Sequence, residues 1–484
     1  MFAGTDQASP PAVRGRRDAV PPRSAPAFAL LAAVQVVLIL AITMLSVALP
    51  RIQHELGLSP AELTLVSATY GLSFSGLLLL GGRAADLYGQ RRTFLWGTGV
   101  FAVASVAAGL APDTVTLLAG RFAQGVGAAF AAPAAMALAG SLFPEPARRG
   151  RAMAVWGGLA PLGATLGTLA SGALTTWISW RWTFAVPAVV AAAAVLVAPR
   201  LLPRSQAAAT GRVDVVGAVL ATAGLSVLSY GLVHAAEAPW TSATVTVPGI
   251  AGILLLAGFL VVERRAADPL LPLGFLASGP RAGALIAVLV GSAGIATMFF
   301  LLSLHFQQIS GLSPLLTSAA FLPFSAVLVA TGMLAARLVK RFGPRTAVTA
   351  GLLIAAAGLL LLGRTTADSP YAGALLGGLL LFPAGISLVF SGATVAVVEN
   401  VPDDRAGLAG GLVNTALETG PTVGLAILVS LAASHTGATS GLDEAARAGA
   451  TAGGYAFAFN SAAAGFAVCA LLTAVTLRTR TSGD

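Results

Sequence analysis

The feature that most constrains this chain is a succession of long apolar stretches that contain almost no charge. Several exceed the roughly 18 residues that an α-helix needs to cross a membrane. Charged residues make up 10% of the chain and hydrophobic residues 56%, whereas soluble domains average about 25% charged residues. A water-soluble globule is therefore excluded, and the unit of organisation is the membrane-spanning helix.

Hydropathy predicts fourteen such helices, so the expected fold class is an all-α integral membrane protein. The approximate ranges are 27–50, 62–82, 93–112, 114–141, 152–174, 181–200, 213–234, 246–263, 281–304, 315–339, 346–364, 371–397, 407–432 and 454–477. Polar segments bracket the seventh and eighth ranges, which divides the helices into groups of six, two and six. We therefore expect two pseudo-symmetric six-helix bundles and two additional central helices.

The same segments set the predicted domain boundaries. They give a disordered basic tail, an N-terminal bundle, a linker with two transmembrane helices, and a C-terminal bundle, over residues 1–26, 27–200, 201–280 and 281–484.

The basic residues predict the orientation in the membrane. An even number of helices places both termini on one side. All but five of the 28 basic residues then fall on that side; the exceptions are Arg51, Arg181, Arg364 and Arg447 in the opposite loops and Arg121 within a helix. Because cytoplasmic loops are rich in arginine and lysine, both termini are predicted to be cytoplasmic. Abundant Ala, Gly and Arg beside a single Lys suggest a bacterial plasma membrane protein.

Several kinds of chemistry are excluded by the residues that are missing. One cysteine, Cys469, and four scattered histidines cannot form a zinc or redox cluster. With Lys340 as the only lysine, the Gly-Lys-Ser/Thr step of a phosphate-binding loop is absent. We expect no metal, no cofactor and no enzymatic activity. The histidines fall at or beyond predicted outer ends and are expected to be solvated, with an outer vestibule as an alternative for His305; the others are His54, His234 and His435.

An internal repeat supports the division into halves. The segment GRAADLYGQRR, from Gly82 to Arg92, has a weaker echo in ARLVKRFGPR, from Ala336 to Arg345. Aligning Gly89 with Gly343 makes the 62–82 helix equivalent to the 315–339 helix. Parallel repeats around a central site are typical of secondary transporters.

Glu418 is the strongest candidate for chemistry inside the membrane. It lies about 11 residues, or ~16 Å, into the 407–432 helix, near the middle of a ~30 Å hydrocarbon core. A carboxylate is costly to ionise there, so Glu418 is a candidate proton carrier. The alternative is a permanently protonated side chain that bonds a neighbouring helix.

Uncharged polar and small residues mark further candidate positions. Gln35, Gln124 and Asn414 lie in predicted helices and either bind cargo or hold helices together. Small residues recur every four positions along two helices: Gly163, Gly167 and Ser171, and then Ala416, Gly420 and Gly424. Such faces let helices pack closely and slide, and Pro421 can bend the second of them.

These segments resemble the major facilitator superfamily, specifically its fourteen-helix drug/proton antiporters, from about Gln35 to the last helix. GRAADLYGQRR is similar to the signature between the second and third helices, RFAQGVGAAFAAP to the motif of the fourth, and GATLGTLASG to the antiporter motif of the fifth. QQISGLSP, from Gln307, is also similar to that family. The departures are Ala41 in place of Asp, Ser46 in place of Asn, Thr168 in place of Pro, Ser171 in place of Gly, and Lys340 in an acidic position.

The resemblance implies proton-driven export of small amphipathic compounds by alternating access, in which Arg121 takes part in proton coupling and Ser46 lines the cargo cavity. Arg121 snorkelling outward is the alternative. The resemblance also implies a conformational gate at Gly82, Asp86, Gly89 and Arg91, with Asp86 facing a helix N-terminus of the other half. The expected partners are cargo, protons and lipid, with no nucleic acid, for a functional monomer. A nutrient or peptide importer and a non-transporting membrane protein remain alternatives.

The missing acid at Ala41 carries a further expectation. Glu418 becomes the only carboxylate deep in a predicted helix. A proton carrier is neutral for part of each cycle, so Glu418 cannot serve as a permanent counter-ion for a cationic cargo. Neutral, zwitterionic or weakly anionic cargo is therefore expected to be preferred over dications.

Overall fold

The computed structural model describes residues 24–143, 145–203, 214–235, 238–266, 269, 274, 278–399, 406–437 and 443–477. All regular secondary structure in these ranges is helical. Most of the predicted basic tail lies outside the described residues, as does much of the polar segment near residue 205.

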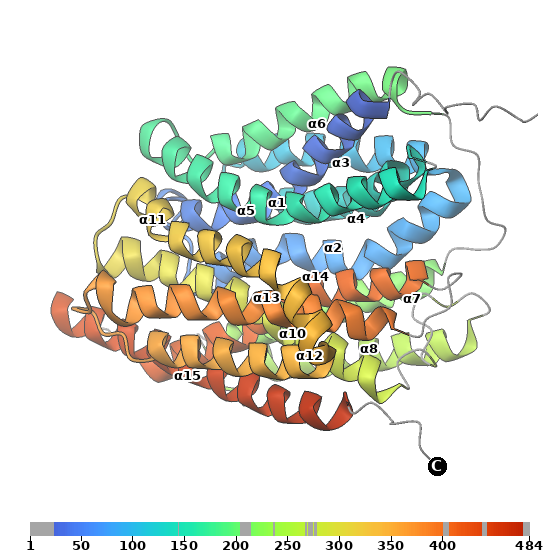
Figure 1. The fold of residues 1–484 in the computed structure, drawn as a ribbon. Helices are drawn as coiled ribbons and strands as arrows, with labels where there is room; N and C mark the ends of the chain where they lie inside the picture. Colours follow the sequence, from blue (N-terminus) through green and yellow to red (C-terminus); the bar gives the residue numbers. More distant parts are fainter. Residues whose placement is uncertain are drawn as a thin grey trace, which may run out of the picture.

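The helices form an elongated bundle in which most axes run in similar directions (Figure 1). Their bounds are α1 Ser24–Leu56, α2 Pro60–Tyr88, α3 Gln90–Gly109, α4 Thr114–Ser141, α5 Pro146–Trp177, α6 Trp182–Leu201, α7 Val215–His234, α8 Ala243–Arg265, α10 Gly279–Leu304, α11 Pro314–Ala320, α12 Leu322–Leu362, α13 Leu376–Val398, α14 Ala406–Thr436 and α15 Glu444–Thr476, with π-helices η1 His305–Ile309 and η2 Tyr371–Leu375. We call α1–α6 the first half and α10–α15 the second half.

Eleven helices of the described ranges are long and apolar enough to cross a membrane. One of them, Pro314–Leu362, has 49 residues and at ~1.5 Å per residue is long enough for two crossings. Helices α3 and α5 coincide with predicted spans but are not among the eleven. The all-helical membrane fold is thus confirmed, whereas the count of fourteen crossings stays a prediction.

Short polar signals fix where individual helices begin. Ser59 caps α2 through a reciprocal pair of bonds with Glu62: the Glu62 backbone N–H donates to Ser59 Oγ at 3.2 Å, and the Ser59 N–H donates to Glu62 Oε2 at 2.9 Å. Asp113 caps α4 by accepting from the Thr116 N–H at 2.8 Å. Each cap satisfies a backbone donor that the first helical turn leaves without a partner.

The repeat seen in the sequence has a backbone counterpart. Gly89 separates α2 from α3 with φ of +91°, and Gly343 interrupts α12 with φ of +80°. Positive φ is costly for residues that carry a Cβ, so glycine is needed at both turns. Neighbour relations also recur, because α1 packs on α5 as α10 packs on α14.

Helices α7 and α8 lie at the edge of the bundle. Helix α7 packs against α2 and α14, one helix from each half, while α8 packs mainly on α7. On α8, Val247, Ile250 and Leu254 are largely exposed, as suits side chains that face lipid. Figure 1 shows that α1 begins and α15 ends at the same end of the bundle. We call the opposite end, where α1 passes into α2, the α1–α2 end.

Candidate functional site

A buried polar cluster in the first half is centred on Arg121 of α4, which is 1% exposed. Its Nη1 donates to Gln124 Oε1 at 3.1 Å and to the Ala41 carbonyl of α1 at 3.3 Å. The guanidinium also lies over the Tyr70 ring of α2, 4.8 Å from its centroid. Arg121 is therefore held inside the bundle and does not snorkel outward.

Gln124 extends this cluster to α3. Its side chain is 0% exposed, and Nε2 donates to Ser105 Oγ at 2.7 Å. Ser105 in turn donates to the Phe101 carbonyl at 2.7 Å. Of the two roles considered for Gln124, this geometry is that of a residue that links helices and orients Arg121.

No carboxylate of the described residues lies within ion-pair distance of Arg121. The cation is stabilised instead by the Ala41 and Val66 carbonyls, the Gln124 amide oxygen and an aromatic face, all of which can stabilise a buried guanidinium. Tyr70 and Ser105 were not predicted from the sequence. Their only signal was a polar group within an apolar helix, which many structural residues share.

The other candidates for a cargo cavity are spread over α1 and α14. Gln35 is partly exposed, and its Oε1 atom is buried without a hydrogen-bond partner among the described residues. Ser46 is partly exposed, and Asn414 on α14 is exposed. Glu418 also lies on α14, but its side chain is outside the described residues. The roles of these four residues stay predictions.

The small-residue face of α5 packs on α1, within the first half. A Cβ on Gly163 would lie 3.1 Å from the Val36 carbonyl oxygen. A Cβ on Gly167 would lie 3.2 Å from Leu40 Cα, and Ser171 Oγ donates to the Met44 carbonyl at 2.5 Å. These residues set the close approach of two helices in one half.

The opposite side of the same α5 segment contacts the second half. Ser318 Oγ of α11 donates to the Thr168 carbonyl at 2.7 Å. A Cβ on Gly172 would lie 2.8 Å from the Pro314 carbonyl oxygen. The antiporter-like segment GATLGTLASG therefore joins α1 on one side and α11 on the other.

Helix α14 shows the equivalent packing in the second half. Ser292 Oγ of α10 donates to the Ala416 carbonyl at 3.3 Å. A Cβ on Gly420 would lie 3.0 Å from the Leu289 carbonyl carbon, and one on Gly424 would lie 2.9 Å from Ala293 Cα. Pro421 lies within α14, directly after the close contact at Gly420.

The predicted gate residues lie at the turn between α2 and α3. Asp86 is exposed, and no hydrogen bond or ion pair links it to the described residues of the second half. Arg91 Nη2 donates to the Pro199 carbonyl at the end of α6, at 2.7 Å. A Cβ on Gly82 would have Pro133 Cβ as its nearest neighbour, at 3.9 Å. Among the described residues, Asp86 makes no contact that would form the expected latch with a helix end, and the gate role of these residues stays a prediction.

The two halves are closed against each other at the α1–α2 end. Between described residues we find five hydrogen bonds across the halves, and each lies toward this end. A continuous hydrophobic core here includes Leu45, Leu49 and Ile52 of α1 together with Phe300 and Leu301 of α10. This arrangement seals one end of the interface between the halves.

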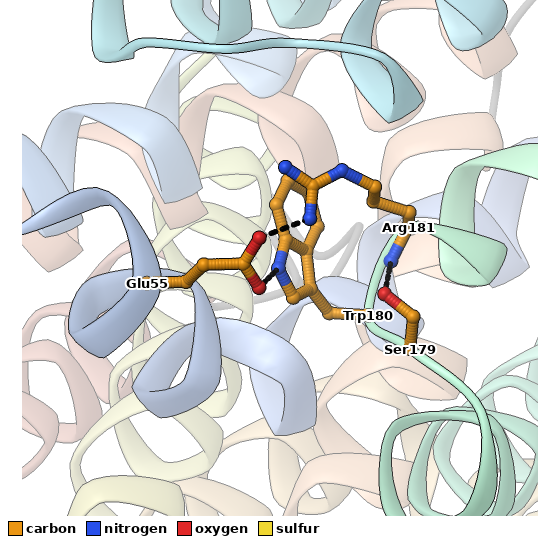
Figure 2. A network of polar contacts seen from close by, with 4 residues as sticks. All are labelled: Glu55, Ser179, Trp180 and Arg181. Carbon is orange, nitrogen blue, oxygen red and sulfur yellow. Dashed lines mark hydrogen bonds and ion pairs between the residues drawn. The ribbon is translucent and has the colours of Figure 1, made fainter.

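A polar staple at the same end ties α1 to the connection between α5 and α6 (Figure 2). Trp180 Nε1 donates to Glu55 Oε2 at 2.6 Å, and Arg181 Nη1 pairs with the other oxygen of Glu55. The Arg181 guanidinium also stacks over the Trp180 ring, 4.4 Å from its centroid. All three residues belong to the first half, so the staple links two of its elements and does not cross to the second half.

The histidine prediction was wrong at one position. His54 and His435 are exposed, whereas His305 is 1% exposed and begins the π-helix η1. His305 contacts the edge of the Phe306 ring, and Phe306 in turn packs on Phe321 and Tyr371 of the second half. Hydropathy could not show that the helix continues past its apolar run.

Two similarly packed helical halves, closed together at one end and built from apolar helices, define the architecture of a secondary membrane transporter. The sequence model of the Major Facilitator Superfamily matches residues 31–425. The chain belongs to this superfamily and is a multi-span membrane transporter of small molecules.

Relatives in this superfamily include proteins named for antibiotic resistance and export. The chain is 39% identical over 459 residues to the puromycin resistance protein pur8 of Streptomyces alboniger. The matched region covers 93% of this chain and 90% of the relative. It is 38% identical to the cephamycin export protein CmcT of Amycolatopsis lactamdurans, over 81% of this chain and 82% of the relative.

Solved structures share the fold at low sequence identity. A bacterial homologue of the human lysosomal transporter Spinster, in an inward-facing and unoccupied conformation, has a TM-score of 0.66 and 16% identity, covering 95% of this chain and 97% of that chain. The peptide transporter POT in complex with sulfate has a TM-score of 0.66 and 16% identity, covering 93% and 94%.

Proposed function

We propose that this protein exports antibiotics or other small amphipathic compounds from the bacterial cytoplasm in exchange for protons, by alternating access. The observation that carries the proposal is the closure of two similarly packed halves at one end, in a chain related over most of its length to a puromycin resistance protein. Alternating access needs two such halves that close at either end in turn.

The proposed topology has fourteen membrane spans and both termini in the cytoplasm. The halves comprise residues 27–200 and 281–484, and residues 201–280 supply the two additional helices. The α1–α2 end is then extracellular, and the structure is closed outside, as in the inward-facing relative of this fold. A cytoplasmic reporter fused after Trp240 should be inactive, and an active one would contradict this topology.

Proton coupling is assigned to Glu418 and Arg121. The depth of Glu418 in α14 supports the first assignment, and the fixed, buried guanidinium of Arg121 supports the second. A proton moving inward down 100 mV releases ~2.3 kcal/mol, and each pH unit adds ~1.4 kcal/mol. One proton can therefore drive a several-hundred-fold gradient of neutral cargo.

A resistance panel in a pump-deficient host tests the function directly. Expression should raise resistance to at least one amphipathic antibiotic, and inverted vesicles should take up that compound only with a proton gradient. Uptake that is independent of the gradient would contradict proton coupling. The absence of any resistance or flux would favour a non-transporting membrane protein.

An importer of nutrients or peptides is the second candidate. The shared fold of peptide transporters favours it, but at 16% identity the likeness extends to the fold alone. Accumulation in right-side-out cells, instead of depletion, would support the importer.

A further inference from the structure

Helix α1 contains a proline, Pro50, in the stretch that contacts the second half. A proline has no backbone N–H, so the carbonyl four residues earlier lacks its intrahelical donor, and the ring also pushes that carbonyl away from the helix axis. In α1 this carbonyl belongs to Ser46. Because it lies at a helix–helix interface, another group has to supply its hydrogen bond.

The second half supplies that donor. Ser303 Oγ of α10 donates to the Ser46 carbonyl at 2.7 Å. Gln307 Nε2 of η1 donates to the neighbouring Val47 carbonyl at 3.0 Å and to Ser303 Oγ at 3.1 Å. A carbonyl oxygen has two lone pairs, so Val47 can accept from Gln307 besides its own helix.

The donors are held on a distorted segment. Gln307 lies in the π-helix η1, whose last turn is closed by the Ser310 N–H donating to the His305 carbonyl at 2.9 Å. Ser303, one turn before Gln307, is 0% exposed. Single π-turns inside α-helices occur frequently at functional sites. Here the π-turn follows directly on α10 and brings an amide donor beside a serine hydroxyl, facing α1.

We propose that Pro50, Ser303 and Gln307 form a latch at the outer gate, in which two side chains of the second half hold the α1 carbonyls exposed by the proline. The inference rests on the proposed alternating access, because a latch has a function only if the α1–α2 end opens. We call these three residues with the Ser46 and Val47 carbonyls the Pro50 latch.

The latch is suited to repeated opening. When the halves separate, water can replace both donors, so each bond contributes little net free energy and breaks without a large penalty. The Ser46 carbonyl has no helical donor to return to, and it is available again when the halves close. Two such bonds are sufficient to shift a two-state equilibrium about tenfold.

Cysteine accessibility measures the latch without requiring transport. Cys469 is the only cysteine and is buried, so Cys469→Ala gives a background without thiols. Thr168→Cys places a thiol of similar size at the interface, on a residue that is 4% exposed. Its rate of reaction with an impermeant maleimide added outside whole cells reports how often this end opens.

In this background we expect Pro50→Ala, Ser303→Ala and Gln307→Leu each to raise the labelling rate about threefold, because each removes one of two bonds that together shift the equilibrium about tenfold. Two matched controls should stay within twofold. Pro187→Ala removes a proline from α6, which makes no described hydrogen bond to the second half. Gln308→Leu removes the neighbouring amide, whose bond to Gln53 Oε1 at 2.8 Å is exposed, where water replaces it.

A double-mutant cycle isolates the role of the proline. If Pro50 acts by exposing the Ser46 carbonyl, combining Pro50→Ala with Ser303→Ala should give little more than the larger single effect. Independent, multiplying effects would overturn the latch, as would parental labelling in folded Ser303→Ala and Gln307→Leu proteins. If Pro50→Ala does not fold, these two variants decide the matter. If the parental protein shows no flux but the latch variants are labelled faster than it, the result would support the latch and refute the exporter.

Discussion

At the scale of single residues, Arg121 shows how a cation is accommodated in an apolar bundle. Burying an unpaired guanidinium is costly unless its donors are satisfied. Here the Ala41 carbonyl and Gln124 Oε1 accept from Nη1. Ala41 has no polar side chain, so only its backbone carbonyl can accept this hydrogen bond. The first half therefore holds a positive charge that no described acid neutralises.

Replacing Gln124 by leucine should destabilise the protein. The substitution leaves the Arg121 guanidinium without its amide acceptor and leaves Ser105 Oγ without a donor. The expected loss is about 1–3 kcal/mol or somewhat more, because one group is charged. Thermal unfolding in detergent measures it. Gln308→Leu, which removes an exposed amide, is the matched control and should have little effect. Equal stability of the two variants would show that the hydrogen bonds of Gln124 to Arg121 and Ser105 do not stabilise the fold.

Replacing Glu418 by glutamine should abolish uptake driven by the proton gradient, because an amide keeps the size of the side chain but cannot release a proton. Cargo binding should survive. Vesicle flux and equilibrium binding of the same compound separate the two effects. Full gradient-driven uptake by the variant would remove Glu418 from the coupling mechanism.

At the scale of elements, the close contacts of α5 with α1 and of α14 with α10 define the two halves. Each depends on residues without a side chain, or with a hydroxyl that bonds to the facing backbone. In membranes, helix association depends on such close packing and on interhelical hydrogen bonds. The sequence spacing indicated the small-residue faces, but not which neighbour each one meets.

Gly420→Ala should damage the packing of α14 on α10. The added Cβ would lie 3.0 Å from the Leu289 carbonyl carbon and closer still to its oxygen, and a backbone cannot move aside cheaply. Overpacking of this kind costs about 1–3 kcal/mol. The control is Gly465→Ala in α15, where a Cβ would have no neighbour within 4 Å. Melting temperature and flux should fall in the first variant only; unchanged stability of Gly420→Ala would mean that α14 shifts freely.

Asp86→Asn should slow transport severalfold while cargo binding in detergent changes little. Asp86 is exposed here and makes no described bond to the second half, so its proposed attraction to a helix end acts only when the cytoplasmic end closes. Asn removes the charge and keeps the shape. Loss of binding with unchanged access from both sides would count against a gate role.

At the scale of the whole molecule, the distribution of charge predicts the cargo. A desolvated cation needs a buried counter-ion. Glu418 is the only proposed deep acid, and it has to be neutral for part of each cycle, whereas Arg121 stays buried in the first half. Among the described residues of the two halves, no buried carboxylate offers a permanent site for a second positive charge.

A host that expresses this protein should resist neutral, zwitterionic or weakly anionic compounds more than bis-cationic dyes. The test compares inhibitory concentrations for matched members of these classes in a pump-deficient strain, with the Glu418→Gln variant as the inactive reference. Resistance confined to the dications would overturn this reasoning and indicate an acidic site elsewhere.

The sequence by itself determined the membrane class, the approximate ranges of the helices and the repeat centred on Gly89 and Gly343. These properties depend on local composition and on backbone conformations that single residues impose. It also indicated Arg121 and Glu418, because a charge in an apolar stretch is conspicuous on its own.

Only the tertiary structure decided which groups satisfy those residues and which surfaces meet. Gln124 holds Arg121, His305 is buried, and Ser303 and Gln307 meet carbonyls more than 250 positions away in the chain. None of these relations follows from hydropathy, because hydrogen bonds across a bundle depend on helix rotation and register. In an apolar solvent those variables are set by packing between helices and not by the pattern along any one of them.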